Sequence, residues 1–237
     1  MEPLVQVTDV RKLFGAQTVL DHVSLEVRGG EAVALLGGNG AGKTTLLKIV
    51  ATILRPTAGA VRVAGHDAVR DPEAVRRAVA FAGHGAWVYD DLTARENLRF
   101  WTTLNEWSIG DDELTAALAA VELDRVAAAR VRTFSAGMKR RLSLARVALA
   151  GARVLLLDEP FAGLDQRAKK WLEGALEVFK GRGGALVMVT HSLGRELGVA
   201  DRIAILAGGR IALDTPRAAL DPDDVQRLYA AHGEDGT

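Results

Sequence analysis

The chain has 237 residues, of which 49% are hydrophobic and 25% are charged, and its 30 Lys and Arg residues balance its 30 Asp and Glu residues. This is the composition of an ordinary globular protein, without the basic excess that proteins bound to nucleic acid usually show. We therefore expect no nucleic-acid partner. The sequence contains no cysteine, which excludes disulfides and thiolate metal sites.

The sequence shows neither a secretory signal nor a membrane-spanning segment. The first residues have neither the basic start nor the apolar run of a secretory signal. The longest apolar runs, such as Val154–Leu157, are far shorter than the roughly 20 residues of a membrane helix. We expect that the chain does not enter a bilayer by itself.

Apolar runs of strand length alternate with helical patterns along the chain. Residues 23–27 alternate apolar and polar side chains, as in a strand with one wet face, whereas Val33–Leu36 is a continuous apolar run, as in a strand buried on both faces. A glycine-rich turn, a helix over Gly42–Leu54 and a later helix over Gln166–Phe179 are also predicted. Further strands are predicted at Val79–Ala82, Val154–Leu157, Ala185–Val189 and Ile203–Leu206, with a hairpin turn at 207–210. Because helices separate most strands, we predict an α/β fold with a mostly parallel sheet core.

The stretch from Leu92 to Ala150 contains no convincing strand. It includes a predicted helix over Glu113–Leu123, with Asp111 or Asp112 as its cap. We predict one domain over 1–237, in which an α/β core (1–84 and 151–220) carries an inserted helical subdomain (85–150) and a C-terminal tail (221–237).

A glycine-rich segment, Gly37–Thr44, matches G-x-x-x-x-G-K-[ST] and stands between a predicted strand and a predicted helix. In this motif backbone N–H groups curl around phosphate oxygens, and side chains in place of the glycines would hinder that approach. The N-terminal end of the helix adds its positive dipole. The residues predicted to contact the nucleotide here are Gly37, Asn39, Gly40, Ala41, Gly42, Lys43, Thr44 and Thr45.

Two side chains of this segment have chemical roles. Lys43 would supply a full positive charge to the β- and γ-phosphates, and the Thr44 hydroxyl would be a ligand of Mg²⁺. The sequence thus predicts ATP and Mg²⁺ as cofactors.

A second motif is the pair of acidic residues, Asp158 and Glu159, that follows the apolar run Val154–Leu157. Carboxyl ends of parallel strands lie beside the nucleotide in such sheets, so Asp158 is expected to orient Mg²⁺ and Glu159 to accept a proton from the attacking water. The alternative is a strand end with two solvated acids. A phosphate-binding loop earlier in the chain favours the catalytic interpretation.

A third motif selects among phosphate-loop families. The segment Phe134–Met138 reads F-S-A-G-M and resembles the L-S-G-G-Q signature of ATP-binding-cassette proteins, in its expected place before the acidic strand. It departs from that signature at Phe134, Ala136 and Met138. The resemblance implies that Ser135 and Gly137 approach a phosphate. Ser135 also suits the N-cap of an ordinary helix, which is compatible with this role.

Other segments resemble the same family in order. Ala162–Asp165 resembles the loop that crosses the dimer interface, which implies that Asp165 lies near the nucleotide. Val187–His191 ends in a histidine like the family's switch histidine, which touches the γ-phosphate. Phe14 stands where the family places an aromatic that stacks on adenine, although a lone phenylalanine also suits a core. The resemblance covers about residues 4–220 and implies a P-loop NTPase (RecA-like) core with an antiparallel β part near the N-terminus.

The resemblance also implies an assembly. In this family ATP lies between the phosphate loop of one subunit and the signature of the other, so a chain with one of each is half an active unit. We expect an ATP-dependent, head-to-tail dimer of two copies, which opens after hydrolysis.

One position departs from the family pattern. His84 stands where the family has a glutamine that senses Mg²⁺ and the attacking water, and an imidazole can take over such hydrogen bonds or touch a metal. The alternative is a polar loop residue. Gly83-His84, together with Leu92–Leu98, resembles the ATP-binding subunits of bacterial haem exporters for cytochrome c maturation.

The resemblance implies an ATPase that drives separate integral membrane subunits from the cytoplasmic face of the cell membrane, as a peripheral protein. Trp87 and Tyr89 are the expected contacts with those subunits. The alternatives are the ATPase of another ABC-2-type exporter of drugs, lipids or polysaccharides, a soluble cassette protein that acts on DNA or ribosomes, and a regulatory module without turnover. Long insertions and basic extensions are absent from the sequence, and Lys43, Asp158, Glu159 and His191 are all present, which argues against the last two.

Overall fold

The computed structural model describes residues 2–83, 85, 87–191 and 194–233. The chain divides into two units, which we call the sheet unit (1–81, 152–160 and 176–237) and the helical unit (82–151 and 161–175). The sequence predicts residues 161–175 as part of the α/β core, whereas in the structure they cluster with residues 82–151.

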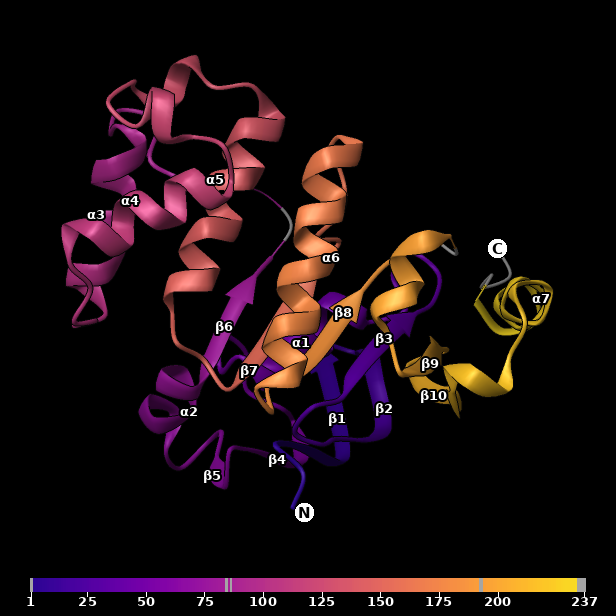
Figure 1. The fold of residues 1–237 in the computed structure, drawn as a ribbon. Helices are drawn as coiled ribbons and strands as arrows, with labels where there is room; N and C mark the ends of the chain where they lie inside the picture. The colour runs from indigo at the N-terminus through magenta and orange to yellow at the C-terminus, as the bar shows by residue number, and fades with distance from the viewer. Residues whose placement is uncertain (1, 84, 86, 192–193, 234–237) are drawn as a thin grey trace. The chain divides into compact units, whose positions relative to one another are not determined.

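A six-stranded sheet forms the centre of the sheet unit, with strand order β10-β9-β3-β8-β7-β6 (Figure 1). Strand β3 pairs in parallel with β8 and β9, β7 pairs in parallel with β8, and β10 pairs antiparallel with β9. The predicted mostly parallel core is therefore confirmed. The strands are β3 (Ala32–Leu36), β6 (Val79–Ala82), β7 (Val154–Asp158), β8 (Ala185–Val189), β9 (Arg202–Ala207) and β10 (Arg210–Pro216).

Strand β3 is buried on both faces. Val33 and Leu35 belong to one hydrophobic cluster, and Ala34 and Leu36 belong to another that includes Ile203 and Ile205 of β9. Because successive side chains of a strand point to opposite faces, a strand between two clusters needs an apolar residue at every position. The unbroken apolar run in the sequence has this physical cause.

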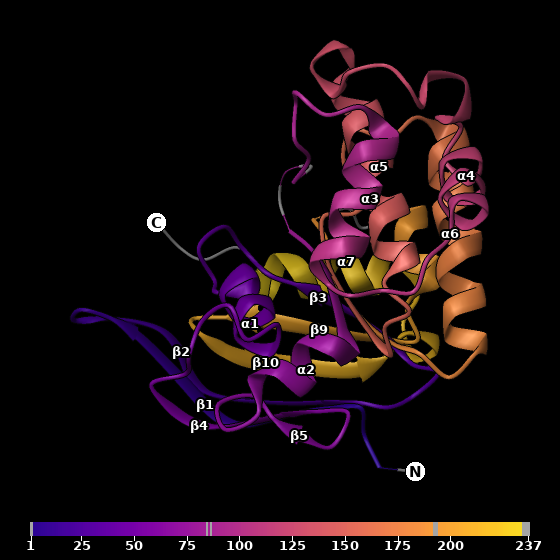
Figure 2. The same ribbon diagram turned by 90° about the vertical axis from the view of Figure 1, so that its left-hand side faces the viewer.

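A second, four-stranded sheet has the order β2-β1-β4-β5, and its strands pair antiparallel, as the predicted fold class requires (Figure 2). Its strands are β1 (Val5–Phe14), β2 (Gln17–Val27), β4 (Ala58–Val63) and β5 (His66–Asp67). Helix α1 (Lys43–Val50) contributes Leu46, Leu47 and Ile49 to a cluster shared with residues of both sheets.

Helix α1 is shorter than the predicted Gly42–Leu54. The chain turns at Thr52, whose φ is +60°, and the N–H groups of Ile53 and Leu54 both donate to the carbonyl of Lys48. The remaining regular element before the helical unit is α2 (Pro72–Ala78).

The helical unit contains α3 (Ala94–Leu104), α4 (Asp111–Ala120) and α5 (Ala136–Leu149), which lie side by side in Figure 2. Helix α6 (Gln166–Gly181) begins in this unit, and short 3-10 helices occur at 124–126, 131–133, 195–199 and 217–219. The N-cap of α4 is Gly110, so the predicted caps Asp111 and Asp112 are wrong. Glu113 accepts a hydrogen bond from the Gly110 N–H at 2.8 Å and so stabilises this helix start.

The segment predicted as a tail, 221–237, contains helix α7 (Pro222–Gly233). Its Val225 is buried in the cluster formed by β3 and β9, so the hydrophobic effect attaches this helix to the sheet. Within the described parts of the chain, no helix combines the length and the apolar character that a membrane span requires.

Candidate active site

The loop between β3 and α1 has a backbone that only glycine fits at two positions. Gly37 has φ +150°, and a Cβ there would lie 2.2 Å from the carbonyl oxygen of Leu206. Gly42 has φ +104°, and its Cβ would lie 2.7 Å from a methyl carbon of Leu20. Bulk and backbone conformation therefore both require glycine, and the loop presents bare N–H groups at the start of a helix.

Lys43 is 6% exposed, and its side chain turns back into the loop. Its Nζ donates to the carbonyl oxygens of Gly37 and Gly38, both at 2.7 Å. A buried ammonium needs such partners. The positive charge is thus held within the loop whose shape suits a phosphate chain.

Thr44 and Asp158 meet across the sheet unit. Thr44 lies in the first turn of α1, Asp158 ends β7, and the Thr44 hydroxyl donates to Asp158 Oδ2 at 2.8 Å. Asp158 is only 3% exposed. Two adjacent oxygen ligands fit Mg²⁺, which typically uses one or two protein oxygens and completes its shell with phosphate and water. Among the described residues, no group of three or more His, Cys, Asp or Glu side chains is placed to hold a metal ion.

Glu159 and His191 form the third pair. Glu159 Oε1 lies 3.0 Å from His191 Nε2. Glu159 follows β7 and its N–H donates to the carbonyl of Val189 at 2.9 Å, and Val189 ends β8, two residues before His191. Neighbouring parallel strands thus bring the acid and the imidazole together. Glu159 has φ +50°, a conformation that costs energy for a residue with a side chain and that is common at functional sites.

Ser135, Gly137 and Asp165 belong to the helical unit. Ser135 is the exposed N-cap of α5, and its hydroxyl accepts a hydrogen bond from the Met138 N–H at 3.2 Å. A Cβ on Gly137 would lie 3.3 Å from the carbonyl of Gly163, so the signature segment and the loop 162–165 are in contact. Asp165 accepts a hydrogen bond from the Ala168 N–H at 2.8 Å, which is typical of a helix N-cap.

Phe14 and His84 are the remaining predicted positions. Phe14 ends β1 and is 47% exposed, with Lys12 Nζ 4.8 Å from its ring centre, so it is not a core residue. His84 lies outside the described residues. Arg140 of α5 donates from Nη1 to the carbonyl oxygens of Gly83, at 3.0 Å, and Gly85, at 3.3 Å.

Sequence reasoning missed two residues beside these segments, Arg140 and Tyr229. The hydroxyl of Tyr229 on α7 donates to the carbonyl of Gly37 at 3.3 Å. Both contacts join residues far apart in the chain. Neither has a local sequence signal, because a single Arg or Tyr on a helix is far more often a packing or surface residue.

The helical unit has an aromatic cluster on its surface. The rings of Tyr89 and Phe100 pack edge to face at 4.7 Å, and the guanidinium of Arg146 lies 4.5 Å from the ring centre of Trp101. Burial lowers the pKa of Arg146 to about 10. Trp87 and Tyr89 are both exposed.

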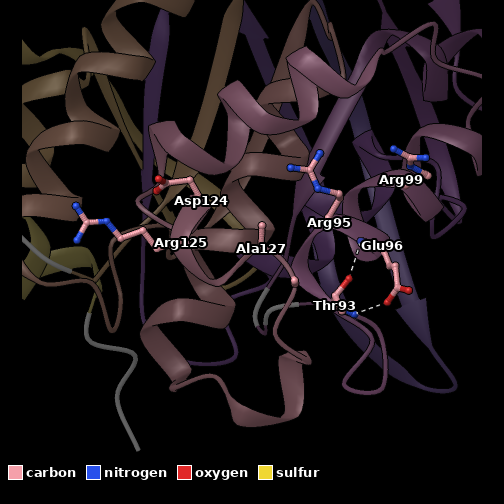
Figure 3. A pocket seen from close by; sticks show the side chains of 8 residues that line it. Thr93, Arg95, Glu96, Arg99, Asp124, Arg125 and Ala127 are labelled. Atoms are coloured by element: carbon pink, nitrogen blue, oxygen red, sulfur yellow. Dashed lines mark hydrogen bonds between the residues drawn. The ribbon is translucent and has the colours of Figure 1, made fainter.

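A cavity of about 520 Å³ opens elsewhere on the helical unit, beside the start of α3 (Figure 3). Its wall includes Thr93 and Glu96, whose reciprocal hydrogen bonds, at 2.7 and 3.1 Å, are drawn as dashed lines. Hydrogen bonding to the Thr93 backbone N–H, and to a smaller extent to the Thr93 side chain, holds the pKa of Glu96 below its ordinary value. These contacts form a capping box for the helix, and none of the predicted site residues lines the cavity.

Known proteins resemble this chain over most of its length. The sequence pattern of the family described as "ABC transporter" matches residues 20–162. A daunorubicin resistance ATP-binding protein of Streptomyces coeruleorubidus is 35% identical over 209 residues, which cover 87% of this chain and 66% of that protein. A hemin import ATP-binding protein of Nocardia farcinica is 39% identical over 223 residues, which cover 90% of this chain and 76% of that protein.

The match to drug-resistance relatives leaves part of their length uncovered. A doxorubicin resistance ATP-binding protein of Mycobacterium tuberculosis is 36% identical over 213 residues, with 87% of this chain and 64% of that protein covered. The chain therefore spans slightly less than two thirds of these relatives.

Solved structures agree with the family assignment. The ATP-binding subunit of an ABC transporter has a TM-score of 0.84 and 30% identity, and the match covers 98% of this chain and 95% of that one. A dimeric ATP-binding cassette bound to ADP and Pi has a TM-score of 0.81 at 24% identity and shares the fold. On these matches, the chain belongs to the ABC transporter family and contains its ATP-binding domain.

Proposed function

We propose that this chain hydrolyses ATP with Mg²⁺ and that Lys43, Thr44, Asp158, Glu159 and His191 carry the reaction. The observation that supports this most directly is that all five lie in the sheet unit and form three sets of contacts. These are the lysine inside its loop, the hydroxyl–carboxylate pair and the carboxylate–imidazole pair. A chance glycine-rich turn would not be accompanied by the other two.

The roles follow from the chemistry of these side chains. Lys43 and the loop N–H groups bind the phosphates, together with Asn39, Gly40, Ala41 and Thr45, and Phe14 is proposed to stack on adenine. Glu159 accepts the proton of the attacking water, and His191 holds the Glu159 carboxylate and touches the terminal phosphate. Thr44 and Asp158 would hold Mg²⁺, which supplies charge neutralisation on the phosphates. We keep His84 as a further proposed ligand and catalytic residue on sequence grounds.

The proposed metal site makes a specific prediction. Thr44→Val removes the hydroxyl that contacts Asp158 and keeps the side-chain shape. We expect the Mg²⁺ concentration for half-maximal ATP hydrolysis to rise roughly tenfold or more, because lost ligand or outer-shell contacts typically cost that much in metal affinity. The measurement is ATPase rate against free Mg²⁺. Thr115→Val removes a hydroxyl from an exposed position on α4 and should leave the curve unchanged, whereas an unchanged curve for Thr44→Val would contradict the assignment.

We further propose that two copies bind ATP head to tail, with Ser135 and Gly137 of one copy on the ATP held by Lys43 of the other, and with Asp165 in the adjoining loop. Ser135 is the exposed N-cap of α5, and the start of a helix favours anions, which supports this. The partners would be integral membrane subunits that the chain joins as a peripheral protein at the cytoplasmic face of the cell membrane. Trp87 and Tyr89 would contact them, and no nucleic acid is involved.

The cargo is a narrower proposal. Gly83-His84 and the segment Leu92–Leu98 support haem export for cytochrome c maturation. Relatives named for daunorubicin and doxorubicin resistance support the alternative, an exporter of drugs. The cargo would be recognised by the membrane subunits in either case.

One experiment tests the partner and the cargo together. The chain is purified in detergent from its own membranes with an affinity tag, and the co-purifying membrane protein is reconstituted in vesicles. We expect ATPase activity to rise when either haem or an anthracycline is added, and the stimulating compound identifies the class. Chain that elutes without a membrane protein, and whose activity neither compound changes, contradicts the transport proposal while leaving ATP hydrolysis intact.

A further inference from the structure

The C-terminal helix reaches the phosphate loop through one side chain. Tyr229 lies on α7, and its hydroxyl donates to the carbonyl oxygen of Gly37 at 3.3 Å. Its ring is partly buried and packs against the cluster formed by β3, β9 and Val225. The hydroxyl is thus held at the first glycine of the loop by a side chain whose other end is anchored in the core. Tyr229 lies outside residues 20–162, which match the family pattern.

The Gly37 carbonyl is shared between two donors. Lys43 Nζ donates to the same oxygen at 2.7 Å, and a carbonyl oxygen has two lone pairs and can accept both bonds. Gly37 is buried. Its close approach to the Leu206 carbonyl, where a Cβ would lie at 2.2 Å, leaves this peptide little room to turn toward another donor.

Nucleotide binding changes which groups donate hydrogen bonds to the Gly37 carbonyl. When Lys43 redirects its N–H bonds to phosphate oxygens, as the proposed function requires, the Gly37 oxygen loses its charged donor. A buried carbonyl without a donor carries a free-energy penalty. The Tyr229 hydroxyl is already in place to avoid that penalty.

We propose that Tyr229 is a positioning residue for nucleotide binding, which keeps the Gly37 carbonyl hydrogen-bonded while Lys43 is engaged by phosphate. The inference rests on the proposed function. It makes α7 part of the nucleotide site, through the loop backbone and without contact to the nucleotide itself.

Loss of the Tyr229 hydroxyl should have different effects with and without nucleotide. Without nucleotide, Lys43 still donates a hydrogen bond to the Gly37 oxygen, so the loss changes the free energy of unfolding little. With nucleotide bound, the same loss leaves a buried acceptor unpaired. We therefore expect Tyr229→Phe, which retains the packed ring, to weaken Mg-ATP binding about five- to tenfold. The same ratio is expected for Mg-ADP, because the β-phosphate also attracts Lys43.

The test compares three proteins by calorimetric titration with Mg-ATP and Mg-ADP, by steady-state ATPase kinetics and by thermal unfolding without nucleotide. For Tyr229→Phe we expect a raised Kd and KM, a kcat close to that of the wild type and an unchanged Tm. Leu228→Ala is the matched control, because Leu228 precedes Tyr229 on α7 and packs against the same cluster. That variant should lower Tm and leave the Kd unchanged.

Two results would contradict the role proposed for Tyr229. If Tyr229→Phe binds both nucleotides as tightly as the wild type, the hydroxyl has no role in binding and the proposal is wrong. If the variant loses Tm without nucleotide as Leu228→Ala does, Tyr229 is a packing residue, which also overturns the proposal. A wild-type chain that binds neither nucleotide would instead overturn the proposed function on which this inference depends.

Discussion

Glu159→Gln is expected to lower kcat for ATP hydrolysis by a factor on the order of 10² to 10⁴, the usual range for removal of a general base. An amide cannot accept the proton that the carboxylate takes from water. Glutamine has the same shape, so it bears the φ of +50° at this position as the glutamate does and can still hydrogen-bond His191. We therefore expect the Kd for ATP to change little. Single-turnover hydrolysis and equilibrium binding, measured on the same protein, separate the two effects.

The control for this substitution is Glu177→Gln, which makes the same chemical change at an exposed position on α6. It should retain wild-type kcat. A Glu159→Gln protein with more than half of the wild-type kcat would show that another group activates the water.

The hydrolysis-impaired chain also tests the head-to-tail dimer. Because it keeps ATP, Glu159→Gln with saturating Mg-ATP is expected to elute at twice the monomer mass in light-scattering chromatography, and to return to monomer with Mg-ADP. A protein that stays monomeric with Mg-ATP, even with its membrane partner supplied, contradicts the shared site.

Lys43→Ala is expected to weaken ATP binding on the order of 100-fold, since it removes two or more charge-assisted hydrogen bonds to phosphate at about 1.4 kcal/mol each. The lysine is nearly buried in the loop, with Nζ donating to Gly37 and Gly38, and it is the one charged residue of Gly37–Thr44. The loss should appear in Kd rather than in kcat alone. Equilibrium titration with a fluorescent ATP analogue measures it directly.

Lys48→Ala is the matched control, because Lys48 lies on the same helix, in its last turn. Removing that charge costs at most the small interaction of a cation with the helix C-terminus and should leave the Kd for ATP unchanged. Equal losses of affinity in the two variants would mean that net charge, rather than the position of Lys43, governs binding.

The parts of the fold and site that the sequence predicted are those with local causes. The phosphate loop is specified by glycines at positions where a side chain cannot fit, and Gly37 and Gly42 show both reasons. The central strands are specified by unbroken apolar runs, because β3 supplies alternate residues to two clusters. Such signals lie within a few consecutive residues and can be identified without tertiary contacts.

The α4 cap and the contacts of Arg140 and Tyr229 were not predicted, because they depend on backbone groups or on residues far away in the chain. Gly110 caps α4 because Glu113 bonds back to its N–H, although two aspartates that follow it are better caps by residue type. Arg140 and Tyr229 donate hydrogen bonds to backbone carbonyls 55–192 residues away in the chain. Contacts of this kind depend on how the sheet and helices pack, and no periodic pattern encodes them.

Because β3 is buried on both faces, nucleotide binding should affect amide hydrogen exchange throughout the sheet unit. A strand that belongs to two hydrophobic clusters is expected to exchange its amide hydrogens only when the whole sheet unit opens. The phosphate loop begins directly at the end of that strand, so a ligand held there adds to the free energy of global unfolding rather than to that of a local opening. Bound nucleotide should thus slow exchange at amides of β3, β8 and β9 that never approach it.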